Sequence, residues 1–175
     1  MTDSDGLESG PFRILALLAL IGSCSSLVAL VLVEVWQVIG RYALNDSPSW
    51  TEPVALLLLK FALMLGAAVG IRSGAHFRFL LLVEVSGPKW RARLEAIALV
   101  VCALIGAVLT IWSSIMATDT WGIKVAGAAL PTGIYFVPFF TGGALICLFA
   151  IERLFLPAPK TEPPVTETLE QTHGR

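Results

Sequence analysis

The stretch ILALLALIGSCSSLVALVLV, residues 14–33, decides the fold class. It carries no charged residue, and a helix of this length, rising about 1.5 Å per residue, spans the hydrocarbon core of a bilayer. Because that core offers no water to backbone N–H and C=O groups, a crossing segment must be a helix or part of a closed barrel. The run is continuous and lacks the alternation of barrel strands. It therefore predicts a transmembrane helix.

Three further stretches have the same character, and composition supports all four. The chain is 56% hydrophobic and 14% charged, whereas soluble domains carry about 25% charged residues. We predict an all-α integral membrane protein whose four transmembrane helices form one domain, residues 12–155. The predicted spans are 14–36, 53–71, 95–118 and 130–152. Pro138 lies inside the last span and is expected to kink it or loosen a turn.

Positive charge orients these helices. The connection between the second and third spans is rich in Arg and Lys, whereas the other two connections hold only Arg41 and Lys124. By the positive-inside rule the middle connection and both termini are expected in the cytoplasm. Within this connection, residues 77–85 are apolar but too short to span, which predicts an interfacial amphipathic helix over about residues 76–86. Residues 1–11 and 156–175 are predicted cytoplasmic tails, the second one disordered.

Two charges stand out within the apolar runs. Lys60 lies about two turns into the second span, where a lone ammonium costs on the order of 2.5–3.5 kcal/mol. One interpretation is a proton or ion relay, and the other is an ion pair that fixes packing. We favour the ion pair, because a relay needs a chain of ionisable groups. The hypothesis is that Lys60 pairs with Glu34 of the first span or with a partner subunit.

The loop before the second span is dense in polar groups. Ser49 or Thr51 is expected to cap that helix, with Pro53 in its first turn. Helix capping does not explain the other polar and aromatic residues of this loop. Their chemistry fits either contact with a partner protein or simple anchoring at the membrane interface. The residues in question are Arg41, Asn45, Trp50 and Glu52.

Other patterns indicate packing and not chemistry. Gly66 and Gly70 form a G-x-x-x-G pair that permits close helix approach. His76 is interpreted as a hydrogen-bonded structural residue in preference to a pH sensor. No nucleophile–base pair, phosphate loop or metal-ligand spacing is evident, so we predict no enzyme and no metal or cofactor site. The near-zero net charge argues against binding nucleic acid.

Taken together, several motifs resemble the small membrane subunit, DctQ-like, of tripartite ATP-independent periplasmic (TRAP) transporters. They are Arg41-Tyr-x-x-Asn45-x-Ser47-x-x-Trp50-Thr-Glu52, Gly66-Ala67, Arg72-x-x-x-His76-x-Arg78, Pro88-Lys-Trp-Arg-Ala-Arg93 and Leu130-Pro131-x-Gly133-x-x-x-x-Pro138. The resemblance covers about residues 12–155. This chain departs from the family's pattern at Pro53 and Leu80, where an acid is frequent, and at Lys60, where an apolar or aromatic residue is usual.

The resemblance implies a subunit of the bacterial inner membrane that packs beside a large polytopic permease subunit. That partner would hold the substrate and sodium sites, and a periplasmic binding protein would deliver an organic acid such as a carboxylate. Arg41, Asn45, Trp50 and Glu52 would then structure the outer loop, while Arg72 and His76 would tie the second helix to the interfacial helix. Two other functions stay open on the sequence: a self-sufficient homodimeric transporter, and an accessory subunit of a respiratory complex.

Overall fold

The computed structural model describes residues 12–46, 48–73 and 88–155, with side-chain detail from residue 93 in the last range. Within them it has four long helices: α2 (Arg13–Tyr42), α3 (Thr51–Ser73), α5 (Pro88–Asp119) and α6 (Val137–Phe155). A short 3₁₀ helix, η2 (Thr132–Phe136), leads into α6. All four spans are long and apolar enough to cross a membrane, which confirms the predicted helical class and number. The predicted helix at 76–86 and both tails lie outside the described residues.

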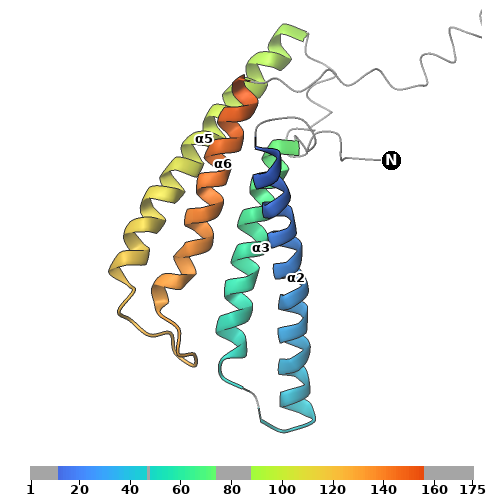
Figure 1. The fold of residues 1–175 in the computed structure, drawn as a ribbon, viewed down its shortest axis with the longest axis vertical. Coiled ribbons are helices and arrows are strands. Elements are labelled where there is room, and N and C mark those ends of the chain that lie inside the picture. The colour runs from blue at the N-terminus through green and yellow to red at the C-terminus, as the bar shows by residue number, and fades with distance from the viewer. Residues whose placement is uncertain (1–11, 47, 74–87, 156–175) are drawn as a thin grey trace, which may run out of the picture.

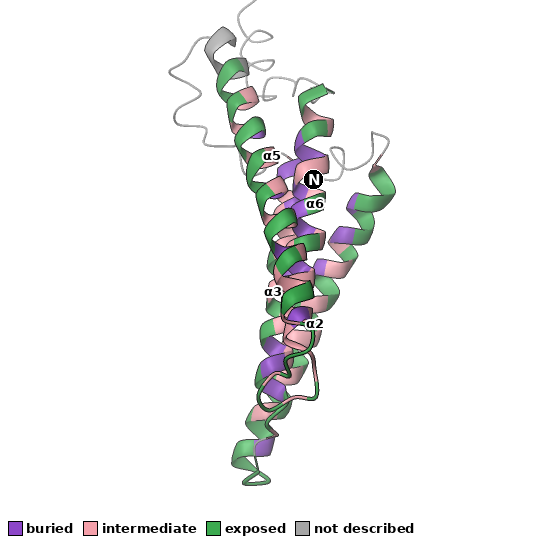
Figure 2. Ribbon diagram, turned by 90° about the vertical axis from the view of Figure 1, so that its left-hand side faces the viewer, coloured by how far each residue is buried: buried purple, intermediate pink, exposed green. Residues whose placement is uncertain are grey.

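The four helices stand side by side in one row, in the order α2, α3, α6, α5 (Figure 1). The view in Figure 2 looks along this row from its α5 side, so that the helices overlap. Two antiparallel hairpins, α2–α3 and α5–α6, are joined through α3 and α6. We call the end with the connections 43–50 and 120–131 the loop end, and the end where α2 begins and α6 finishes the terminal end.

A row buries little apolar surface, because its outer helices have only one close neighbour each. Leu32 of α2 is 65% exposed and Leu104 of α5 is 61% exposed, and many large apolar side chains are like them. In lipid such surfaces are satisfied, since acyl chains are as apolar as leucine. The buried core, toward the terminal end, draws on all four helices: Ala16, Ala68, Ile71, Leu99, Ile146, Phe149 and Ala150. The architecture is that of a multi-pass membrane protein.

Small residues set the contact between α2 and α3. The Ser23 hydroxyl donates to the Ala62 carbonyl at 2.9 Å, and both residues are buried. A Cβ placed on Gly66 would lie 3.1 Å from the Ser23 Oγ. Glycine at this position therefore lets α3 approach α2 closely enough for the interhelical hydrogen bond to form.

Replacing Ser23 with alanine is expected to lower the free energy of unfolding by about 0.6 kcal/mol, the average for interhelical hydrogen bonds in membranes. The Ala62 carbonyl keeps its bond within α3, so the loss stays small. The measurement is unfolding in mixed micelles. Ser25→Ala is the matched control, because that exposed hydroxyl donates to Gly22 of its own helix. A larger effect at Ser25 than at Ser23 would contradict the assignment.

The fourth span starts differently from the prediction. The α-helix begins at Val137 and not near residue 130, so Pro138 occupies its first turn. The sequence predicts a kink or a loosened turn at Pro138; in α6 this residue stands in the first turn, where it has no intrahelical N–H bond to lose. The preceding turn is wound as η2, whose Ile134 N–H donates to the Pro131 carbonyl at 3.1 Å.

Candidate functional site

Ionisable side chains gather at the terminal end, in a group we call the terminal-end network: Arg72, Glu95, Glu152 and Arg153. Arg72 of α3 donates Nε to Glu152 Oε2 of α6 at 3.1 Å and Nη2 to Oε1 at 3.4 Å. The two side chains are only 5% and 8% exposed. The guanidinium carbon also lies 5.7 Å from the Phe149 ring centroid. This bidentate pair joins the two hairpins.

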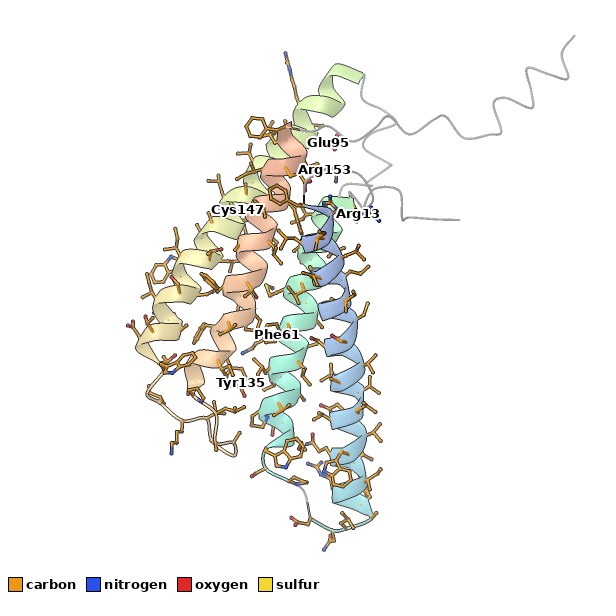
Figure 3. All side chains as sticks on the ribbon, in the orientation of Figure 1. Arg13, Phe61, Glu95, Tyr135, Cys147 and Arg153 are labelled. Carbon is orange, nitrogen blue, oxygen red and sulfur yellow. The ribbon has the colours of Figure 1, made fainter. Side chains whose placement is uncertain are left out.

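Arg153 extends the network to a third helix. Its Nη2 donates to Glu95 Oε1 of α5 at 3.0 Å, and its Nη1 donates to the Ile71 carbonyl of α3 at 2.9 Å. That carbonyl is among the last four of α3, which have no partner within the helix. Figure 3 shows Arg153 and Glu95 facing each other across α6 and α5. The network therefore fastens α3, α5 and α6 at one level.

The predicted role of Arg72 changes in consequence. The sequence resemblance tied Arg72 and His76 to an interfacial helix, but Arg72 binds α6, and His76 lies outside the described residues. Glu152, Glu95 and Arg153 were not assigned to the site from the sequence. The sequence does contain a signal for this network. The three charged residues stand at the ends of apolar runs, and in antiparallel helices those ends lie at the same depth in the membrane.

A cleft of about 430 Å³ opens at the loop end between α3, the 120–131 connection and η2. We call it the loop-end cleft. Tyr135 lies on the side of η2 that faces α3 (Figure 3), and its hydroxyl donates to the Pro53 carbonyl at 2.8 Å. The lining residues are Ser49, Glu52, Pro53, Leu56, Lys60, Val125, Ala126 and Tyr135.

Lys60 reaches into this cleft. Its Nζ lies 4.2 Å from the Tyr135 ring centroid and 5.9 Å from that of Phe139. A cation–π contact contributes about 0.5–2 kcal/mol, which offsets only part of the roughly 2.5–3.5 kcal/mol that an ammonium costs in a membrane helix. The ring contacts therefore leave Lys60 short of full compensation.

The predicted pairing of Lys60 with Glu34 is not formed. Neither Lys60 nor Glu34 takes part in the ion pairs Arg72–Glu152 and Arg153–Glu95. Glu34 is exposed on α2, where it borders a shallow apolar depression with Val31 and Val35. Lys60 instead faces η2 and the start of α6, where its Nζ lies over the rings of Tyr135 and Phe139.

The loop residues also divide. Arg41, Asn45, Trp50 and Glu52 are all exposed, and Glu52 also borders the loop-end cleft. Asn45 adopts φ 52°, a left-handed conformation that asparagine tolerates. Glu52 thus shares the loop-end cleft with Lys60.

The two connections at the loop end are bonded to each other. The Ser49 hydroxyl donates to the Gly127 carbonyl at 3.0 Å. Gly127 has φ +82°, and a Cβ there would lie 2.6 Å from the Ser49 carbonyl oxygen, so only glycine fits. The Thr51 hydroxyl donates back to the Pro48 carbonyl at 2.8 Å. Both hydroxyls thus serve the loops, and neither acts as the predicted helix cap.

No group of three His, Cys, Asp or Glu side chains within the described ranges could hold a metal ion. Charged groups gather in two places. Those of the terminal-end network fasten helices to one another, and those of the loop-end cleft line a cavity at the edge of the membrane span.

Comparison with known proteins agrees with this architecture. The family model of the DctQ component of tripartite ATP-independent periplasmic transporters matches residues 30–159, which include most of the row and both polar regions. The sialic acid TRAP transporter small permease protein SiaQ of Vibrio cholerae is 29% identical over 86 residues. That alignment covers 49% of this chain and 50% of the relative, so the chain matches about half of the relative's length. The chain thus belongs to the DctQ family of TRAP transporter small permease components, and it is a transport component and not an enzyme.

Proposed function

We propose that this chain is the small permease subunit of a TRAP secondary transporter in the bacterial inner membrane, and that it forms a fixed scaffold for a large polytopic permease subunit. The large subunit holds the substrate and sodium sites, and a periplasmic binding protein delivers an organic acid. Family membership supports this function. The observation that carries it is the single row of helices with apolar faces on either side.

A flat row suits a scaffold. Its apolar faces can pack along another helical membrane protein over the whole membrane thickness, since every helix of the row is accessible from the side. The terminal-end network keeps the row rigid, because a buried bidentate pair between α3 and α6 resists sliding of one hairpin on the other. Arg72 and Glu152 bind each other, so they serve packing and not ion transfer.

The proposed orientation puts the terminal end in the cytoplasm and the loop end in the periplasm. The excess of Arg and Lys between residues 72 and 95 supports it. The substrate class is an organic acid, in line with the sialic acid of the relative's name. In this arrangement the two bonded loops face the compartment from which the binding protein approaches.

Co-expression tests the function. We expect the chain to co-purify one to one with a large TRAP permease subunit. Uptake into proteoliposomes should then require both subunits, the binding protein and a sodium gradient. The chain alone should transport nothing, because its buried charged pair is committed to packing.

Uptake by the chain alone would overturn the proposal in favour of a self-sufficient homodimer. Stable co-purification with haem- or quinone-containing subunits would instead indicate a respiratory complex. A complex that transports equally well after removal of the small subunit would remove the scaffold role while leaving family membership intact.

A further inference from the structure

The loop-end cleft contains two opposite charges that do not contact each other. Glu52 lies in the first turn of α3, and Lys60 follows eight residues later on the same helix. At about 1.5 Å per residue the two Cα atoms are separated by roughly 12 Å along the axis. Side chains of a helix lean toward its N-terminus, so Lys60 leans toward Glu52 along the cleft. Even so, they form no ion pair in the described structure.

The order of these charges matters. The ammonium lies deeper in the membrane span, and the carboxylate lies at the mouth, at the start of the helix. A complementary ligand therefore has an anionic group facing the membrane interior and a cationic group a few ångströms farther out. A phospholipid with a zwitterionic headgroup has this order, because its phosphate lies nearer the acyl chains than its amine does.

We propose that the loop-end cleft binds the headgroup of a phospholipid bearing a primary amine, with the phosphate at Lys60 and the amine at Glu52. The amine donates charge-assisted hydrogen bonds to the carboxylate, and the ammonium donates them to the phosphate. The ligand belongs to the leaflet at the loop end, whichever side of the membrane that is.

The walls of the cleft fit such a headgroup. Its volume of about 430 Å³ lies within the roughly 300–1,000 Å³ range of small-molecule sites. Pro53, Leu56, Val125 and Ala126 supply apolar contact. The Tyr135 ring is held by its hydrogen bond to Pro53 and stays beneath the Lys60 ammonium. Figure 1 shows that the two hairpins diverge toward this end.

An acyl chain has a path away from the cleft. Leu56 and Leu63 are seven residues apart, so they lie on one face of α3. Both are exposed, at 47% and 58%. A chain leaving the phosphate at Lys60 can run along these leucines toward the membrane interior. A free carboxylate could also meet Lys60, but it would lack both the amine for Glu52 and this apolar path.

Lipid binding to the unmodified chain gives the first test. Full-length protein is delipidated in detergent and titrated, by native mass spectrometry, with phosphatidylethanolamine, phosphatidylcholine and phosphatidylglycerol of identical acyl chains. We expect phosphatidylethanolamine to bind at least about tenfold more tightly than phosphatidylglycerol, whose glycerol hydroxyls are uncharged donors, and more tightly than phosphatidylcholine, whose quaternary ammonium has no N–H to donate to Glu52. Equal binding of all three lipids would overturn the proposal.

Variants give the second test. Lys60→Met should weaken binding of phosphatidylethanolamine about tenfold or more, and Glu52→Gln should abolish the preference over phosphatidylcholine. Lys124→Met is the matched control, because this exposed loop lysine does not line the cleft. The affinity of this variant for phosphatidylethanolamine should stay within about twofold of the wild-type value. A Lys60→Met chain that binds like the wild type would contradict the assignment.

Soluble phosphoethanolamine separates a lipid site from a site for a free ion. The proposal expects millimolar phosphoethanolamine to compete weakly, because it lacks acyl chains for the α3 face. Competition as strong as that of the whole lipid would show a site for a soluble zwitterion and overturn the lipid assignment. The measured quantity is lipid retention and not uptake. The result therefore tests the lipid site separately from the proposed scaffold function.

Discussion

Replacing Arg72 with methionine is expected to lower the free energy of unfolding by about 3–5 kcal/mol, the usual cost of breaking a buried ion pair. The substitution leaves the Glu152 carboxylate, which is only 8% exposed, without the guanidinium that donates to it and balances its charge. It also removes the stacking of that guanidinium over Phe149. Because this pair joins the hairpins, the loss should appear as early separation of α3 from α6 during unfolding in mixed micelles.

A double-mutant cycle isolates the pair. Arg72→Met with Glu152→Met should recover most of the lost stability, since apolar side chains of similar volume often replace a buried pair at little cost. Arg13→Met is the control, because Arg13 is also at the terminal end but exposed. If the single Arg72 variant loses less than about 1 kcal/mol, the pair behaves like a surface salt bridge and does not fasten the row.

The four helices were predictable because length and apolarity alone decide whether a segment spans a bilayer. The ends of the helices were less predictable. α2 continues to Tyr42 and α5 begins at Pro88, well beyond the apolar runs. Helix ends reach the membrane interface, where charged residues such as Arg41 are tolerated at low cost and hydropathy no longer marks the boundary.

The order of helices in the row could not be read from the sequence. In water an apolar stripe shows which face of a helix is buried. In a membrane, lipid and protein interior are equally apolar, so α3 shows no such stripe. The hypothesis paired Lys60 with Glu34 because their helices are neighbours in the chain, whereas Lys60 faces Tyr135 of η2 and Phe139 of α6.

The same limit applied to the polar regions. Arg72 was expected to have a structural role, but its partner Glu152 lies 80 residues away. Ser49 and Gly127, which bond the loops, are 78 residues apart. Pairing at such separations follows from how the hairpins dock. A single sequence carries little information on how the hairpins dock, although charges at matching helix ends reduce the number of possible ion pairs.

The contact between α5 and α6 should be sensitive to added volume, because backbone atoms of α6 lie close to Gly106 of α5. Gly106→Leu is expected to lower the free energy of unfolding by about 3 kcal/mol, the upper part of the usual cost of overpacking. A Cβ on Gly106 would lie 2.7 Å from the Gly143 carbonyl oxygen and 2.8 Å from the Cys147 nitrogen. Backbone atoms cannot rotate away, so the two helices must separate.

The chain's own cysteines report this separation. Cys147 and Cys102 are half-buried on α6 and α5, whereas Cys24 of α2 is exposed and serves as an internal reference. In Gly106→Leu, maleimide should label Cys147 and Cys102 faster relative to Cys24, and at a lower temperature. Ala144→Leu is the control, because Ala144 is exposed on α6 and a leucine there meets lipid. Unchanged relative labelling would show that the helices yield without parting.

A second-site test distinguishes backbone contact from side-chain contact. At Gly22 a Cβ would meet only Leu65 Cδ1, at 3.0 Å, and a flexible side chain can move aside. Gly22→Ala should therefore be tolerated, and any loss should be rescued by Leu65→Ala. No shortening on α6 can rescue Gly106→Leu, since position 143 is already glycine and its carbonyl is the obstacle. Rescue by Ile146→Ala alone would mean that the side chain, and not the backbone, limits how closely α5 and α6 approach.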